Sequence, residues 1–209
     1  VVEDVGYYLG ASQGGIFGAT LMSLFTDVTR GALVVPGQPY NLLLSRSKNF
    51  DTYRTLLATN VDEGPAMQLA LAYIQHLWDR SDPGSFSGHI RENLFPNTPA
   101  HEVLLVDAIG DHQVTTLGAH TMARSIGAVL LTPSPRPVYG LEEVMGSHEG
   151  SALVEIDWGV PEPITNVPPR EGDDPHNAYE GHPTAVENTV RYLRTGVIDH
   201  PCDGPCDPL

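Results

Sequence analysis

Short apolar runs alternate with longer amphipathic stretches, and this pattern predicts strands and helices that follow one another along the chain. Helices are predicted over Gly14 to Phe25, Thr116 to Ile126 and Pro183 to Arg194, where apolar residues recur at helical spacing. Four runs rich in aliphatic residues are predicted to be strands: Asp4 to Leu9, Gly31 to Val35, Val103 to Ala108 and Leu153 to Trp158. This order is typical of an α/β fold with a mostly parallel sheet flanked by helices.

Residues 36–100 interrupt this alternation, because they are far longer than the single crossover helix that two parallel strands require. Within them, Pro65 to Asp79 carries apolar residues at helical spacing and is predicted to be an amphipathic helix. We expect residues 36–100 to form a partly helical cap above the strand ends. Residues 1–35 and 101–209 would then form the core, with a long proline-rich and acidic loop over residues 159–175.

A Gly-x-Ser-x-Gly motif, Gly10 to Gly14, follows the first predicted strand and opens directly into the first predicted helix. In this context Ser12 stands on a tight turn that exposes its hydroxyl at the carboxyl edge of the sheet. Glycine is expected at both Gly10 and Gly14, because a Cβ there would collide with the neighbouring strand or helix. The backbone N–H of Gln13, at the positive end of the helix, points to where an oxyanion would form. An ordinary glycine-rich turn is the alternative interpretation.

With this motif, the chain resembles the α/β-hydrolase family over most of its length except the cap. The resemblance implies a catalytic acid just beyond the strand that follows the cap. Asp111 lies there after a glycine turn, whereas Asp107, the alternative, lies inside the strand. The catalytic histidine is expected shortly before the final helix, where His176 and His182 both fit. The spacing common in the family, a histidine, six residues and then a proline, favours His176.

The resemblance implies that His176 removes the proton of Ser12 as the hydroxyl attacks an acyl carbon, while Asp111 orients the imidazole ring. This scheme requires neither a metal nor an organic cofactor. His112 and His120 could be mistaken for metal ligands, but the pattern places no third ligand beside them. A surface or supporting role is therefore predicted for both.

A carboxylic ester is the first expected substrate, because ester cleavage is the least demanding use of such a triad. A peptidase or amidase, and a binding protein that keeps the scaffold without catalysis, are the alternatives, since the fold alone does not choose among them. Apolar side chains of the cap are expected either to line an acyl pocket or only to pack the cap on the sheet: Tyr40, Leu42, Leu43, Phe50, Tyr53 and Trp78.

Composition and charge narrow the possible partners. The chain has 26 acidic and 11 basic residues, a formal charge of −15, and Lys48 as its only lysine, so no basic patch for a nucleic acid is visible. No apolar run has the length of a membrane span, and the first residues lack the basic region of an export signal.

Cys202 and Cys206 flank a turn-forming segment and are predicted to form a disulfide, which favours a secreted or periplasmic protein. Free or metal-binding thiols in a cytosolic protein are the alternative.

The position of the motif in the chain has a further implication under the resemblance. In the α/β-hydrolase family the nucleophile strand is usually the fifth of eight, whereas here it is the first predicted strand. The resemblance therefore implies that the N-terminal half of the fold, including the loop with the second oxyanion donor, is carried by a second polypeptide. Cleavage of a longer precursor is the simplest origin, and a portion missing from the sequence at hand is the alternative. Without that half, the first strand would be an open, aggregation-prone sheet edge.

Overall fold

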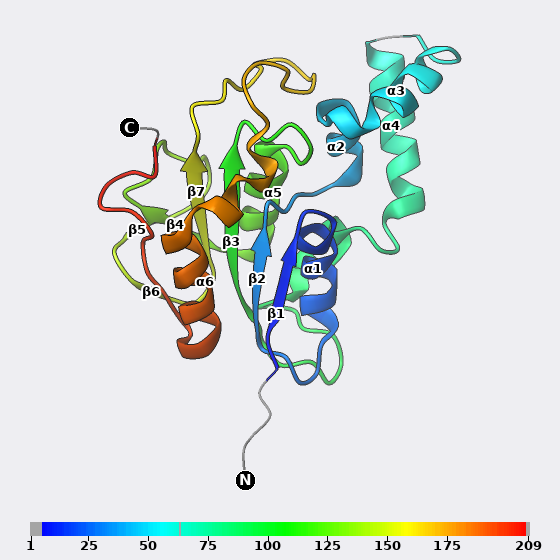
Figure 1. Ribbon diagram of the computed structural model, residues 1–209. Coiled ribbons are helices and arrows are strands. Elements are labelled where there is room, and N and C mark those ends of the chain that lie inside the picture. Colours follow the sequence, from blue (N-terminus) through cyan, green and yellow to red (C-terminus); the bar gives the residue numbers. More distant parts are fainter. Residues whose placement is uncertain (1–5, 63, 208–209) are drawn as a thin grey trace.

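The computed structural model describes residues 6–62 and 64–207. Its centre is a six-stranded sheet in the order β1-β2-β3-β7-β4-β5 (Figure 1). Every pairing within this sheet is parallel, which confirms the predicted α/β fold class. The strands in this order are β1 (Tyr8–Ala11), β2 (Arg30–Val34), β3 (Glu102–Ile109), β7 (Ala152–Asp157), β4 (Val129–Thr132) and β5 (Glu143–Met145). A short antiparallel pair, β6 (His148–Glu149) and β8 (Val197–Ile198), lies beside it.

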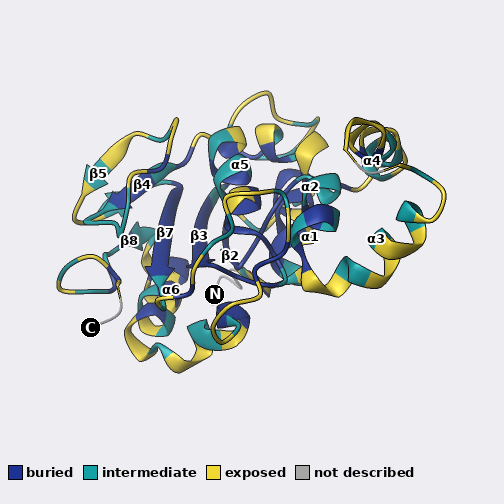
Figure 2. Cartoon of the chain, turned by 90° about the horizontal axis from the view of Figure 1, so that it is seen from above, coloured by how far each residue is buried: buried dark blue, intermediate teal, exposed yellow. Residues whose placement is uncertain are grey.

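Helices cover both faces of the sheet because successive side chains of a strand point to opposite faces. Leu105 of β3 packs with α1 (Gln13–Leu24) and α5 (Thr116–Ile126) on one face. Val106, the next residue, packs with α6 (Pro183–Thr195) on the other face. Viewed from above, α5 and α6 lie on opposite sides of the largely buried strands β3 and β7 (Figure 2). The central strands β3 and β7 are apolar at most positions because both of their faces are buried, with Asp107 and Glu155 as charged exceptions inside them.

The predicted elements agree with the structure to within one residue at each end, with one exception. The first strand was predicted over Asp4 to Leu9, but Asp4 lies outside the described residues and the strand begins at Tyr8. It runs on to Ala11, which still pairs with Val34 of β2. The chain therefore turns only at Ser12, so the first half of the glycine-serine motif belongs to the strand. The short strands β4 and β5 were not predicted.

Residues 36–100 contain α2 (Tyr40–Arg46), α3 (Asp51–Ala58) and α4 (Pro65–Trp78), with three short 3-10 helices: η1 (Lys48–Phe50), η2 (Pro83–Ser85) and η3 (Ser87–His89). Figure 1 shows α2 to α4 beyond the carboxyl ends of β1 and β2, and Figure 2 shows α3 and α4 as largely exposed. Ile90, by contrast, is fully buried in the core layer beneath α1 and α5. The division into core and cap at residue 100 remains a prediction.

The remaining segments complete the carboxyl edge of the sheet and the C-terminal region. The chain after β7 has no helix or strand until η4 (Pro175–Gly181), as expected of the predicted long loop. Cys202 and Cys206 form a disulfide with their Cα atoms 5.5 Å apart, which confirms the predicted pairing. Within the described part of the chain, no helix is both long and apolar enough to span a membrane.

Candidate active site

The turn between β1 and α1 holds Ser12 in a strained backbone conformation. Its φ is 56° and its ψ is −121°, a region that L-residues other than glycine rarely adopt. The turn is held on both sides, since the Ser12 N–H donates to the Val34 carbonyl at 3.0 Å and the Ile16 N–H donates to the Ser12 carbonyl at 2.9 Å. Strain of this kind is maintained only where the surrounding structure enforces it, and it is concentrated at functional sites.

The glycines around Ser12 differ in how much space there is for a Cβ atom. A Cβ on Gly10 would stand 2.4 Å from the Gly14 carbonyl oxygen, so the prediction for Gly10 is consistent with the packing. For Gly14 the prediction of a collision is wrong, because the nearest atom to a Cβ there is the Tyr8 hydroxyl at 3.8 Å. The residue that faces the sheet is Gly15, where a Cβ would stand 2.6 Å from the Val34 carbonyl oxygen.

The structure brings together the three side chains that the sequence singled out. His176 Nε2 lies 2.8 Å from Ser12 Oγ, and His176 Nδ1 lies 2.7 Å from Asp111 Oδ2. Ser12 follows β1, Asp111 follows β3, and His176 belongs to η4 after β7. They meet because parallel strands place their carboxyl ends at the same edge of the sheet.

Burial and hydrogen bonding fix the position of the Asp111 carboxylate beside His176. Asp111 is fully buried and His176 is 6% exposed. The second carboxylate oxygen of Asp111, Oδ1, accepts from the backbone N–H groups of Gln113 at 2.7 Å and Val114 at 3.0 Å. The Asp111 carboxylate therefore has donors on both oxygens and a single orientation toward the imidazole.

Asp107 and His182, the alternative candidates for the catalytic acid and the catalytic histidine, have other contacts. The Asp107 side chain is buried on the face of the sheet covered by α5, and neither of its oxygens has a hydrogen-bond partner among the residues described. Burial and the nearby Glu155 raise its pKa well above the ordinary value. His182 precedes α6, and its Nδ1 accepts from the Ala185 N–H at 3.2 Å. It therefore caps the N-terminus of α6.

Asp174 ties the histidine segment to the rest of the site, and the sequence analysis missed it. One of its oxygens accepts from the backbone N–H of His176 at 3.1 Å and from that of His112 at 3.2 Å. The other accepts from Gln113 Nε2 at 2.8 Å and pairs with Lys48, the only lysine of the chain. Burial raises the pKa of Asp174, but the hydrogen bonds from Lys48 and Gln113 outweigh it and lower the pKa to about 2.

For the ester hydrolysis that the resemblance implies, we predict that Asp174→Ala lowers kcat by roughly 10- to 100-fold with little change in KM, because a displacement of the imidazole by about 1 Å costs up to about two orders of magnitude. Asp174→Asn, which keeps an acceptor for the two backbone N–H groups, should recover part of the loss. Steady-state kinetics of both variants checks this, with Asp207→Ala near the C-terminus as a control. Equal kcat in wild type and Asp174→Ala would contradict the positioning role.

The side chain of Gln13, next to Ser12, contacts the segment of residues 36–100. Gln13 is the first residue of α1, so its backbone N–H has no acceptor within the helix and is available beside the serine. Its side-chain oxygen accepts from the Tyr40 hydroxyl at 2.7 Å, and the Tyr40 ring lies 5.3 Å from the Trp78 ring, measured between centroids. Helices α2 and α4 therefore reach the first turn of α1 through two aromatic side chains.

The two histidines predicted to have a surface or supporting role have different environments. His112 is 6% exposed, and its backbone N–H supports Asp174. His120 does have carboxylate neighbours: its Nε2 lies 2.7 Å from Glu155 Oε1, and Asp107 belongs to the same cluster. The sequence signal for this cluster was a charged residue inside each of two otherwise apolar strands.

No family model matches the chain, and no curated protein matches it. Among solved structures, the enol-lactonase from Burkholderia xenovorans LB400 is similar, with 14% sequence identity and a TM-score of 0.42. The similarity covers 91% of this chain, which spans 65% of the length of that structure. The fold class therefore rests on the sheet topology described above, and the chemistry on the geometry of the site itself.

Proposed function

We propose that this protein is a serine hydrolase of the α/β-hydrolase type, which cleaves a carboxylic ester through an acyl-enzyme. The observation that carries the proposal is the hydrogen-bonded relay from Ser12 Oγ to His176 Nε2 and from His176 Nδ1 to Asp111 Oδ2. A hydroxyl next to a base that is itself oriented by a carboxylate is the arrangement that nucleophilic catalysis requires. The strained backbone at Ser12 and its place at the helix N-terminus support the same conclusion.

The reaction follows from these positions. Ser12 Oγ attacks the acyl carbon while His176 Nε2 takes its proton, and the imidazolium is stabilised by the Asp111 carboxylate. The backbone N–H of Gln13 donates to the oxyanion that forms on the acyl oxygen. His176 then protonates the leaving alkoxide, the C–O bond breaks, and an acyl-Ser12 ester remains. In the second half, a water molecule gives a proton to His176 as its oxygen attacks the acyl carbon. The bond between that carbon and Ser12 Oγ then breaks, His176 returns the proton to Oγ, and the carboxylic acid leaves.

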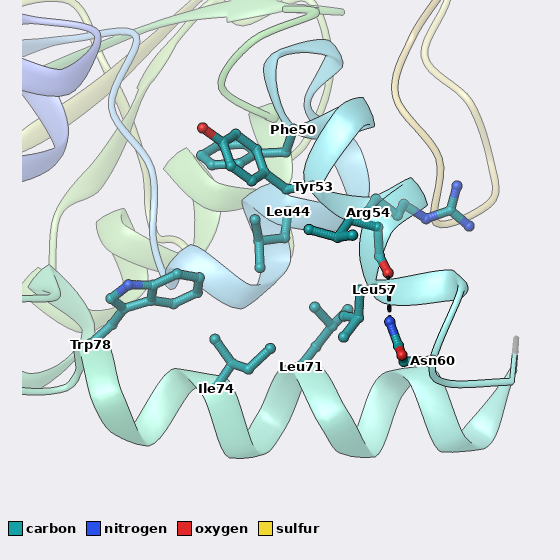
Figure 3. A pocket seen from close by; sticks show the side chains of 10 residues that line it. Leu44, Phe50, Tyr53, Arg54, Leu57, Asn60, Leu71, Ile74 and Trp78 are labelled. Atoms are coloured by element: carbon teal, nitrogen blue, oxygen red, sulfur yellow. Dashed lines mark hydrogen bonds between the residues drawn. The ribbon is translucent and has the colours of Figure 1, made fainter.

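The binding site for the acyl group is proposed to be a cavity of about 470 Å³ in the segment of residues 36–100. Its lining is almost entirely apolar and comes mainly from α2, η1, α3 and α4 (Figure 3), including Leu44, Phe50, Leu57, Leu71, Ile74 and Trp78. Two lining residues, Phe50 and Trp78, have their rings against that of Tyr40, whose hydroxyl donates to the side chain of Gln13 beside Ser12. An apolar pocket of this size accommodates an acyl chain of several methylene groups.

Activity-based labelling tests the proposed function directly. A fluorophosphonate probe should label the folded wild-type protein at Ser12, located by mass spectrometry of the labelled peptide, and heat-denatured protein should not react. Labelling with hydrolysis of p-nitrophenyl esters, but not of aminoacyl-anilides, supports an esterase. Cleavage of the anilides instead would support a peptidase or amidase. Folded protein that is not labelled would contradict the proposal and favour a non-catalytic binding protein.

A second prediction concerns the pocket. Ile74→Trp should fill the cavity between α3 and α4, and it should lower kcat/KM for p-nitrophenyl octanoate by about 10-fold or more while changing that for the acetate by less than about 2-fold. Leu77→Trp is the matched control, because Leu77 lies on the same helix, is 75% exposed and is not among the lining residues. Kinetics across esters of increasing length checks this, and equal losses for both esters would place the acyl chain elsewhere.

We further propose that another segment of sheet, carried by a second polypeptide, pairs with β1. Among the described residues β1 pairs only with β2, and its Leu9 is 56% exposed. Leu21 and Leu24 of α1, the helix that follows β1, are also exposed apolar side chains. Denaturing electrophoresis with mass spectrometry of the active protein tests the proposal, since a single active species of 22.6 kDa would contradict it.

The Cys202–Cys206 disulfide supports the proposal that the protein is secreted or periplasmic.

A further inference from the structure

A second cluster of chemically active side chains lies on the face of the sheet covered by α5, apart from the serine. Asp107 of β3 and Glu155 of β7 are direct neighbours in the register of the two strands, and both point toward His120 of α5. One ligand atom from each of the three side chains lies within 4.8 Å of the others. The proposed mechanism uses none of these residues.

Asp107 is the observation that sets this cluster apart from an ordinary set of ion pairs. The residue is 1% exposed, and in the described part of the chain neither carboxylate oxygen has a hydrogen-bond partner. A buried carboxyl group without any partner is strongly unfavourable, so such groups are rare unless a proton, an ion or a metal compensates them. Both oxygens of Asp107 are therefore available to a ligand held between Asp107, Glu155 and His120.

The charges around the cluster match a dication. Glu155 is within 3.1 Å of the Arg136 guanidinium, which also pairs with Glu162. A bound cation would hold Asp107 in its ionised form despite its raised pKa. The three carboxylates of Asp107, Glu155 and Glu162 would then face this one guanidinium, and a neutral His120 adds no charge. The excess is two negative charges, which a single divalent cation neutralises. Asp111, which is bound to His176, adds to the negative field at Asp107.

From this geometry we infer that Asp107, His120 and Glu155 bind a divalent transition-metal ion. An imidazole nitrogen with two carboxylate oxygens is a donor set suited to Zn²⁺ or Mn²⁺, whereas Ca²⁺ and Mg²⁺ prefer oxygen ligands throughout. Three protein ligands leave at least one coordination position for water.

Little movement is needed to admit the ion. His120 Nε2 and Glu155 Oε1 are 2.7 Å apart, and ligand atoms about 2.1 Å from a metal stand roughly 3.0 to 3.4 Å from one another. The metal is bound by the tautomer of the neutral imidazole that carries its proton on Nδ1 and has Nε2 free, and Arg136 keeps its ion pair with Glu162. The site opens to solvent over His120 and Arg136, whose side chains are 15% and 33% exposed, whereas the Glu155 side chain is fully buried.

The bound ion would cross-link three elements of the core: β3, β7 and α5. Asp111 follows β3 directly and His176 follows β7, so the ion would hold together the two strands that carry the acid and the base. Its expected contribution is to stability, since a ligand that binds only the folded state stabilises it by an amount that grows with the logarithm of its concentration over Kd.

The experiment measures metal binding and melting rather than turnover. Chelator-treated full chain is titrated with Zn²⁺ by calorimetry, and its melting temperature is recorded with and without Zn²⁺, with Mn²⁺ and Ca²⁺ in parallel. We expect one high-affinity Zn²⁺ per chain and, at about 100 times Kd, a rise of roughly 5 to 10 °C in melting temperature. Ca²⁺ should give a much smaller rise.

The variants identify the ligands. Asp107→Asn and His120→Gln should each weaken Zn²⁺ binding by 100-fold or more and abolish the rise in melting temperature. Asp199→Asn is the matched control, because Asp199 pairs with Arg191 of α6 on the other face of the sheet and should leave binding unchanged. Should Asp107→Asn fail to fold, His120→Gln alone decides, since His120 lies at the solvent side of the cluster. Absence of the Zn²⁺-induced rise in wild type, or equal binding by wild type and His120→Gln, would overturn the proposal.

Discussion

Replacing Ser12 by alanine is expected to lower kcat for a p-nitrophenyl ester by roughly 10⁴- to 10⁶-fold, because the acyl-enzyme can no longer form. The substitution removes one hydroxyl and its hydrogen bond to His176. Such a bond contributes only about 1 kcal/mol to folding, so the melting temperature should change by no more than a few degrees. Steady-state kinetics together with thermal unfolding of the same preparation measures both effects.

The loss in Ser12→Ala must be specific to this serine. Ser147→Ala is the matched control, because Ser147 is an exposed serine beside Asp199, remote in the chain from the turn at Ser12. It should retain full activity and full labelling by the fluorophosphonate. If Ser12→Ala kept more than about a tenth of the wild-type kcat, the nucleophile would be another residue and the proposed mechanism would be wrong.

Some features of this fold could be predicted because their signals are local. The long central strands and the four longest helices carry periodic apolar patterns, and the structure places their ends within one residue of the prediction, except for β1. Ser12 was found because a strand, a tight turn and a helix follow one another at that point. Asp111 and His176 were found from the order of residues in a family that the chain resembles, and the structure places both within hydrogen-bonding distance of their expected partners.

Other features could not be predicted because they depend on contacts between distant segments. The short edge strands β4 and β5 have too few residues to establish a periodic pattern. Asp174 connects segments more than 100 residues apart, since it joins Lys48 to the backbone of His176. Likewise, the cluster of Asp107, Glu155 and His120 depends on the register of β3 against β7, which apolar periodicity does not specify. The misassigned glycine, Gly14 in place of Gly15, reflects the rotation of α1 on the sheet.

Asp111→Asn is expected to lower kcat by about 10⁴-fold while leaving the fold intact. The amide oxygen can still accept from the backbone N–H groups of Gln113 and Val114, which bind Oδ1 in the wild type. The amide NH₂ then faces His176 Nδ1, which must become an acceptor. The proton of the neutral imidazole moves to Nε2, and this nitrogen can no longer take the proton of Ser12. The loss therefore arises from the wrong tautomer rather than from a displaced ring.

Kinetics and labelling together separate this effect from structural damage. The rate of fluorophosphonate labelling should fall in parallel with kcat, and the melting temperature should stay close to that of wild type. Asp199→Asn, the same chemical change at an ion pair on the α6 side of the sheet, should retain full activity. A loss of less than about 10-fold in Asp111→Asn would remove Asp111 from the relay. A larger loss in Asp107→Asn than in Asp111→Asn would instead assign the acid to the strand, although neither Asp107 oxygen has a hydrogen-bond partner among residues 6–62 and 64–207.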